Sequence, residues 1–216
     1  QKEIFIKPTT MAKKSQGSLQ NYIYLSIAAA IVTILLKFYT YYITGSMGFL
    51  SDALESFVNL FAAIFALIML KLSQQPADER HMYGHSKAEY FSSAMEGALM
   101  LVAAFSIIWS AIPRIVKPTP LENINAGLLF SLMASLVNLV VGQILIRNGK
   151  SKKSLVLEAD GRHLMTDVWT SVGVIVGIIV VKFTDWLIID PIIAIIVAIN
   201  IILTGYKLIS RSASGL

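Results

Sequence analysis

Residues 124–146 of this chain read INAGLLFSLMASLVNLVVGQILI, an apolar stretch without a charged side chain. Its length matches the roughly 20 residues that a helix needs to cross about 30 Å of hydrocarbon. Five further stretches have the same apolar character, at residues 22–43, 49–70, 91–115, 155–181 and 186–209. We therefore predict six membrane-spanning segments.

The composition of the whole chain also indicates a membrane environment. Hydrophobic residues make up 56% of the chain and charged residues 14%, and the mean hydropathy is +0.69. Soluble globular domains carry about 25% charged residues. The segments lack the period-two alternation of barrel strands, and a helix satisfies its own backbone hydrogen bonds in lipid. The predicted fold class is an all-α polytopic membrane protein with six transmembrane helices.

Basic residues mark one side of the predicted bundle. They cluster before the first segment, between the second and third, between the fourth and fifth, and after the sixth. By the positive-inside rule, this pattern predicts that both termini are cytoplasmic and that the protein lies in the cell inner membrane or plasma membrane. The net charge of +5 then reflects topology, and no nucleic-acid partner is expected. The basic residues on this side are Lys13, Lys14, Lys71, Arg80, Lys87, Arg147, Lys150, Lys152, Lys153, Lys207 and Arg211.

Two pairs of polar residues interrupt the apolar segments. Glu55 and Asn59 lie four residues apart in the second segment, and His163 and Asp167 have the same spacing in the fifth. Residues at i and i+4 share one helix face, and a charged group inside a membrane costs about 2.5–3.5 kcal/mol on insertion scales. The chain has no cysteine, which excludes thiolate ligands. Facing each other, the two pairs would suit tetrahedral Zn²⁺; the alternative is ordinary hydrogen bonding between helices.

Three other features accompany these pairs. Asp52 lies three residues before Glu55 on nearly the same face, and a role behind the ligands or at the start of the helix is favoured over direct ligation. Asp190 is expected to begin or cap the last segment. Gly173 and Gly177 are expected to permit close helix packing.

Three separated stretches resemble the cation diffusion facilitator (cation efflux) family. They are GSMGFLSDALESFVNLFAA at residues 45–63, PADERHMYGHSKAE at 76–89 and EADGRHLMTDVWTS at 158–171. The resemblance covers nearly the whole transmembrane part, with the motifs in the family's order. It implies a homodimeric, proton-coupled antiporter whose central site, built from the second and fifth helices, binds Zn²⁺ or a related ion.

The matching positions assign the central transport site to Glu55, Asn59, His163 and Asp167. The second-helix pair departs from the family, which usually has His or Asp at the first position and Asp at the second. A neutral amide lowers the charge of the site, and an oxygen-rich ligand set also accepts Fe²⁺ or Mn²⁺.

The connection between the second and third segments carries Asp78, His81 and His85. One interpretation is a solvated polar loop. The resemblance implies instead an auxiliary second metal site in this cytoplasmic loop.

The chain divides into three parts. Residues 1–21 form an N-terminal cytoplasmic segment, in which residues 1–10, QKEIFIKPTT, precede a methionine, lack the apolar core of a signal peptide and are a candidate non-native remnant. Residues 22–210 form the six-helix transmembrane transport domain. Because members of the resembled family commonly continue into a soluble domain, residues 211–216 are expected to start a linker to a C-terminal cytoplasmic domain absent from this chain.

The predicted function is antiport that exports a divalent transition-metal cation, Zn²⁺ first, with protons as the counter-ion. Imidazole exchanges a proton near neutral pH and must be neutral to bind a metal, so His163 can couple the two ions. A metal-gated cation channel or a membrane metal sensor is the alternative, because binding and transport share ligands. The chain lacks an HExxH motif, so no enzymatic activity is expected. The expected partners are membrane lipid and a second copy of the chain.

Overall fold

The computed structural model describes residues 10–73, 88–152 and 154–215, and throughout those ranges the regular elements are helices. This confirms the predicted all-α class with six helices. In chain order they are α1 (Thr10–Thr44), α2 (Met47–Ser73), α3 (Ala88–Val116), α4 (Ile124–Lys152), α5 (Leu155–Thr184) and α6 (Ile189–Gly215).

Five of these helices contain a stretch that is long and apolar enough to cross a membrane, by length and composition. They are α1, α3, α4, α5 and α6. The remaining helix, α2, has 27 residues, also enough to cross about 30 Å of hydrocarbon. The helix bounds lie close to the predicted segments except in α1, which begins at Thr10 rather than near residue 22.

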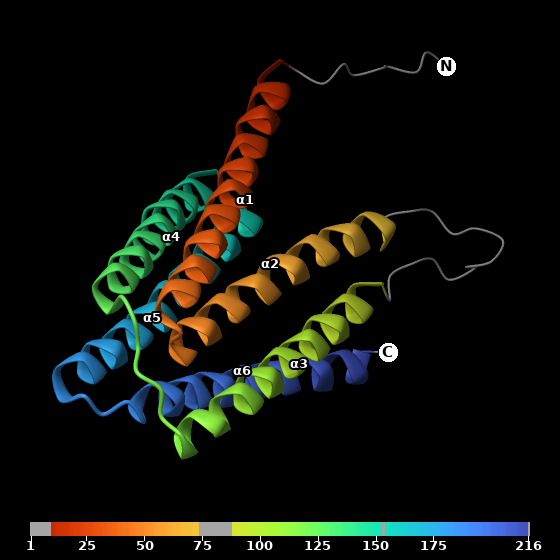
Figure 1. The fold of residues 1–216 in the computed structure, drawn as a ribbon. Coiled ribbons are helices and arrows are strands. Elements are labelled where there is room, and N and C mark those ends of the chain that lie inside the picture. The colour runs from red at the N-terminus through yellow and green to blue at the C-terminus, as the bar shows by residue number, and fades with distance from the viewer. Residues whose placement is uncertain (1–9, 74–87, 153, 216) are drawn as a thin grey trace, which may run out of the picture.

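The helices form two groups that run apart toward one end of the molecule. One group consists of α1, α4 and α5, and the other of α2, α3 and α6. Figure 1 shows the groups diverging toward the end that carries both chain termini. At the opposite end they are joined by a small core in which Phe49 of α2 packs with Val174 and Ile178 of α5. The connection between the groups is therefore concentrated away from the termini.

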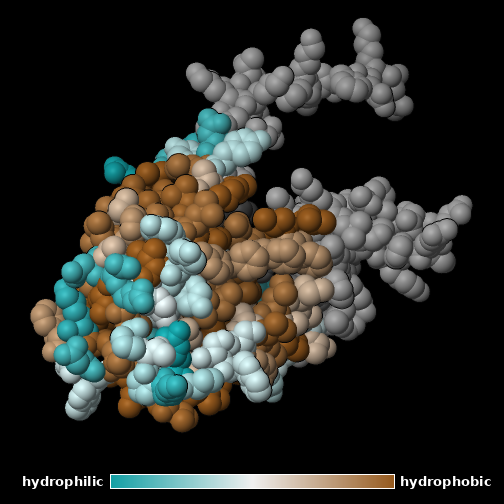
Figure 2. Space-filling view, viewed as in Figure 1, coloured by the Kyte–Doolittle hydropathy of each residue, from teal (hydrophilic) through white to brown (hydrophobic). Residues whose placement is uncertain are grey.

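Apolar side chains cover much of the outer surface. Figure 2 shows them along the sides of the helices, with polar side chains gathered nearer the connections. Trp109 and Phe183 are 81% and 80% exposed. Such a surface is unfavourable in water and favourable in hydrocarbon. The chain is a multi-pass membrane protein.

Close helix contacts occur at glycines, but not at both glycines that the sequence pointed to. Gly177 packs against Ile193 of α6, as expected, whereas a Cβ added at Gly173 would meet nothing within 4 Å. Close approaches to the backbone of a neighbouring helix lie elsewhere. A Cβ at Gly97 of α3 would lie 2.6 Å from the carbonyl oxygen of Gly205 in α6. The 3.6-residue period places Gly173 and Gly177 on adjacent parts of the helix surface, and only one of them faces a neighbour.

Asp190 lies at the start of α6, as predicted, and has a second role that the sequence did not indicate. It lies in the first turn of α6, but its carboxylate accepts hydrogen bonds at the start of α2: from Ser46 Oγ at 2.6 Å, from the Met47 N–H at 2.8 Å and from the Gly48 N–H at 3.0 Å. The first N–H groups of a helix have no partner within the helix, and a carboxylate there also interacts favourably with the helix dipole. Asp190 therefore caps α2 from a distant part of the chain.

Candidate metal site

A buried polar network lies where α2 packs against α1 and α5. The polar residues of α2 are spaced by three and four residues, which places them on one face of the helix. This face points toward the joint between the two helix groups rather than toward lipid. The network consists of Lys37 from α1, Asp52, Glu55, Ser56 and Asn59 from α2, and Asp167 and Ser171 from α5.

A buried ion pair occupies one side of this network. Lys37 Nζ donates to Asp52 Oδ1 at 2.8 Å and to Ser56 Oγ at 2.7 Å. Ser171 Oγ lies 2.9 Å from each carboxylate oxygen of Asp52. The Lys37 and Asp52 side chains are 1% and 2% exposed. Buried pairs are tolerated when additional hydrogen bonds satisfy the remaining atoms, and here these bonds favour a supporting role for Asp52.

Asp167 lies on the other side of the network and receives two bonds from α2. Ser56 Oγ is 3.2 Å from Asp167 Oδ2, and Asn59 Nδ2 is 3.4 Å from Asp167 Oδ1. Two further oxygens here, Asn59 Oδ1 and Glu55 Oε2, are buried and have no hydrogen-bond partner within the described part of the chain. Leaving a polar atom in this condition costs about 1–3 kcal/mol. Glu55 also lies within electrostatic range of Asp167. The arrangement is a set of buried oxygens that a cation would satisfy.

His163, the remaining predicted ligand, lies apart from this set. It is one turn before Asp167 on α5, but it is exposed, whereas Asp167 is 7% exposed. Glu96 of α3 lies within electrostatic range of its imidazole. Over residues 10–73, 88–152 and 154–215, no three His, Asp or Glu side chains converge closely enough to hold a metal ion. The structure thus joins Asn59 to Asp167, places Glu55 beside them and leaves His163 at the edge.

The predicted loop site falls outside the described residues. Asp78, His81 and His85 all lie between Ser73 and Ala88. Their role remains a prediction from the sequence.

Reasoning from the sequence missed Lys37. The signal was present, because Lys37 lies near the middle of an apolar segment, where an ammonium group needs a partner. Ser56 and Ser171 carried no such signal, since serines are common in membrane helices and hydrogen-bond to their own backbone. Only the packing of α1, α2 and α5 shows that both hydroxyls hydrogen-bond to carboxylates.

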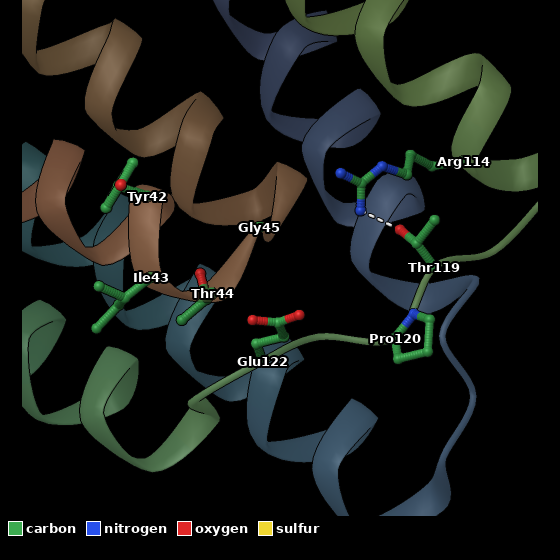
Figure 3. A pocket seen from close by; sticks show the side chains of 8 residues that line it. All are labelled: Tyr42, Ile43, Thr44, Gly45, Arg114, Thr119, Pro120 and Glu122. Carbon is green, nitrogen blue, oxygen red and sulfur yellow. Dashed lines mark hydrogen bonds between the residues drawn. The ribbon is translucent and has the colours of Figure 1, made fainter.

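A pocket at the end of the bundle away from the chain termini contains none of the predicted ligands. It lies where α1 and α3 end, and Figure 3 shows the Arg114 guanidinium donating to the Thr119 hydroxyl, with the Glu122 carboxylate apart from this pair. Its charged groups are thus one cation and one anion near the end of the helices. The lining residues are Tyr42, Ile43, Thr44, Gly45, Arg114, Thr119, Pro120 and Glu122.

Fold and network together define a multi-pass helical membrane protein with ionisable groups buried between its helices. Comparison with protein families identifies the class more closely: the model of the cation efflux transmembrane domain matches residues 23–216. The chain belongs to the cation efflux family. This membership places it among transport domains rather than enzymes.

Individual relatives agree with this membership. An uncharacterized transporter of Synechocystis sp. is 49% identical over 195 residues, which are 90% of this chain and 63% of that protein. The cadmium, cobalt and zinc/H(+)-K(+) antiporter of Bacillus subtilis is 30% identical over 79% of this chain and 55% of its own length. The zinc transporter ZitB of Escherichia coli is 27% identical over 81% of this chain and 55% of its own length. The chain therefore spans less than two thirds of each of these relatives.

Proposed function

We propose that this chain is the membrane domain of an exporter of divalent transition-metal cations, with Zn²⁺ as the first candidate and protons as the counter-ion. The observation that carries the proposal is the pair of buried, unpartnered oxygens, Glu55 Oε2 and Asn59 Oδ1, beside the Asp167 carboxylate. Relatives named as a zinc transporter and as a cadmium, cobalt and zinc antiporter support the choice of ion class.

The amide orientation of Asn59 suits this function. Its Nδ2 group donates to Asp167, which leaves the Oδ1 atom free to accept from a cation. Deprotonated Glu55 and Asp167 together carry two negative charges, which match one divalent ion. His163 supplies the nitrogen ligand if it turns toward Asp167, one helical turn away. An ion bound mainly by oxygen would also admit Fe²⁺ or Mn²⁺.

We propose that the ion enters from one end of the molecule. His163 is exposed and lies one turn nearer the end that carries both termini than the buried Asp167, so an ion arriving from that end would meet His163 first. With both termini cytoplasmic, as the basic residues predict, this end faces the cytoplasm. We therefore propose that the structure represents the inward-facing state of an alternating-access cycle in a homodimer.

The loop residues Asp78, His81 and His85 are proposed as an auxiliary site. Ligands outside the hydrocarbon lose little hydration on binding, so they would adjust affinity or conformational preference rather than maximal flux.

The experiment that tests the central site compares Asp167→Asn with Asp185→Asn. Asp185 is an exposed residue just after α5. Zn²⁺ binding to the purified protein and Zn²⁺ flux into vesicles are measured for both variants. We expect Asp167→Asn to lose at least tenfold in affinity, the lower bound of about 10–100-fold typical for groups that only support ligands, and Asp185→Asn to match the parent. Equal affinity and flux in the two variants would remove Asp167 from the transport site.

A metal-gated channel or sensor would share the binding result. It is distinguished by the energetics of flux, because only an antiporter accumulates metal against its gradient at the expense of a pH gradient.

A further inference from the structure

Lys37 stands at the centre of the buried network without being a metal ligand. It lies near the middle of a membrane-spanning stretch of α1, Tyr24–Thr44, and its side chain is 1% exposed. A lysine at such a depth costs about 2.5–3.5 kcal/mol on insertion scales. Its ammonium group donates to two partners in α2, Asp52 and Ser56, and α2 belongs to the other helix group. The Lys37 ammonium group is therefore held by specific partners at the place where the two helix groups meet.

The first consequence of this position concerns Asp52. Its Oδ1 atom receives Lys37 Nζ, and the Ser171 hydroxyl reaches both of its oxygens. Without Lys37, the carboxylates of Asp52, Glu55 and Asp167 would offer three negative charges when deprotonated. The ion pair with Lys37 neutralises one of them and leaves the two charges of Glu55 and Asp167 for the cation.

The second consequence concerns the orientation of the Ser56 hydroxyl group. An ammonium group is only a donor, so Ser56 Oγ must accept from Lys37. A hydroxyl that accepts at its oxygen keeps one hydrogen to donate, and the Asp167 Oδ2 atom lies 3.2 Å away. Lys37 thus directs the single Ser56 proton at one oxygen of Asp167, while Asn59 Nδ2 approaches the other oxygen.

We propose that Lys37 is a positioning and specificity-determining residue for transport: a fixed internal counter-ion that withdraws Asp52 from the cation site and, through Ser56, orients the Asp167 carboxylate. The proposal rests on the central site proposed above. It predicts that the site accepts one divalent cation on two carboxylates, and that the third carboxylate becomes available when Lys37 is removed. A purely structural ion pair would hold α1 against α2 without influencing which metal binds.

The test uses four variants of the full chain in detergent, with Zn²⁺ and Mn²⁺ affinities and thermal unfolding as readouts. Ser56→Ala breaks the link to Asp167 and retains the ion pair. Its matched control is Ser135→Ala, a buried serine of α4 whose hydroxyl donates to the Ser131 carbonyl of the same helix. Lys37→Met frees Asp52, and Lys37→Met with Asp52→Asn removes the whole pair.

We expect Ser56→Ala to unfold at the same temperature as Ser135→Ala but to bind Zn²⁺ about 10–100-fold more weakly, as for other groups that hold ligands in place. Lys37→Met should shift the ratio of affinities toward Mn²⁺, which prefers additional oxygen ligands. Adding Asp52→Asn should cancel that shift, because the freed carboxylate is then gone.

Several outcomes would overturn the proposal. If Ser56→Ala binds Zn²⁺ like Ser135→Ala, Lys37 does not act through Ser56. If the Zn²⁺ to Mn²⁺ ratio is the same in Lys37→Met and in the double variant, Asp52 is not the group that Lys37 withholds. Should Lys37→Met fail to fold, the Ser56→Ala comparison decides. The proposed transport site itself fails under a different result, namely Zn²⁺ binding by the parent that Asp167→Asn leaves unchanged.

Discussion

Asn59 is the residue at which this chain departs most clearly from the cation efflux pattern. Its amide donates to one oxygen of Asp167 across 3.4 Å and keeps its own oxygen unpartnered. A carboxylate at this position could not donate, and without a cation it would face Asp167 with a like charge. Asparagine therefore suits the proposed metal site when that site is empty, and it contributes one negative charge fewer than aspartate would when a metal is bound.

Asn59→Asp is the corresponding prediction. It should tighten Zn²⁺ binding at neutral pH, make the affinity fall more steeply as the pH is lowered, and reduce the thermal stability of the metal-free protein. The reason is that the added carboxylate must lose a proton before it binds metal, and repels Asp167 when no metal is present. Titration calorimetry at two pH values measures the first two effects.

The control for this variant is Asn125→Asp. Asn125 is an exposed residue near the start of α4, and its side-chain oxygen accepts from Lys182. A pH dependence of Zn²⁺ affinity in Asn59→Asp no steeper than in this control would show that position 59 does not contact the ion.

Among the elements, α2 has two caps at its start. Ser46, the residue before the helix, accepts from the Phe49 N–H at 3.1 Å, and Asp190 of α6 adds a second acceptor. The Asp190 carboxylate accepts from the Ser46 hydroxyl and from two backbone N–H groups of the first α2 turn. Asp190 is 2% exposed, so water cannot take the place of its carboxylate as the acceptor. Asp190 and Ser46 therefore together stabilise the start of the helix that carries Glu55 and Asn59.

Asp190→Asn should destabilise the protein by about 1–3 kcal/mol, because the amide nitrogen that replaces one carboxylate oxygen cannot accept from the group that bonded to that oxygen. Unfolding in detergent, monitored by circular dichroism, measures the change. Asp185→Asn is the matched control, since Asp185 is exposed and its left-handed backbone, with φ of 54°, is a conformation that asparagine tolerates. A stability loss in the control as large as that in Asp190→Asn would contradict the cap.

The crossing of α3 and α6 depends on glycine. An added Cβ at Gly97 would lie 2.6 Å from the Gly205 carbonyl oxygen and 2.7 Å from Ile209 Cγ1. Since the first neighbour is backbone, the two helices would have to separate. We expect Gly97→Ala to lose about 1–3 kcal/mol of stability.

Gly173→Ala serves as the comparison in the same thermal-unfolding assay. Its added methyl group would meet nothing within 4 Å, and alanine is favoured over glycine inside a helix by about 0.5–1 kcal/mol. Gly173→Ala should therefore be neutral or stabilising. Equal effects of the two substitutions would show that helix propensity, not the α3–α6 contact, governs stability here.

For the whole molecule, the arrangement of two helix groups suggests how an ion could be moved. The groups are joined by the core of Phe49, Val174 and Ile178 and run apart toward the termini. The polar network of Lys37 and Asp52 lies across the same joint. A rocking motion of one group against the other would change the access to Asp167 without unfolding either group.

Coupling between metal and protons is a property of the whole transport cycle, and flux measurements test it. Metal binding requires deprotonated carboxylates and a neutral imidazole, so lowering the pH should weaken Zn²⁺ binding. In vesicles with the cytoplasmic face outward, an acidic lumen should therefore drive Zn²⁺ accumulation above its outside concentration, and a protonophore should abolish it. Flux that follows only the metal gradient, with an affinity independent of pH over the range of about 5 to 8 in which imidazole usually titrates, would favour the channel.

The amino-acid sequence by itself determined the all-α class, the number of helices and, within a few residues, most of their bounds. This was possible because lipid imposes one dominant requirement, an apolar stretch of sufficient length, which is local in the sequence. The two i,i+4 pairs and three family motifs also pointed to Glu55, Asn59, His163 and Asp167 without any coordinates.

Only the tertiary structure decided how those polar groups are partnered. It joined Lys37 to Asp52 and Ser56, linked Ser56 to Asp167, and assigned Asp190 to the start of α2. These bonds connect residues on different helices, separated by 15 to 143 positions along the chain. Hydrogen bonds act over about 3 Å and depend on which helix faces meet and at what height. Hydropathy reports that a helix crosses the membrane, but carries no information about its rotation toward a particular neighbour.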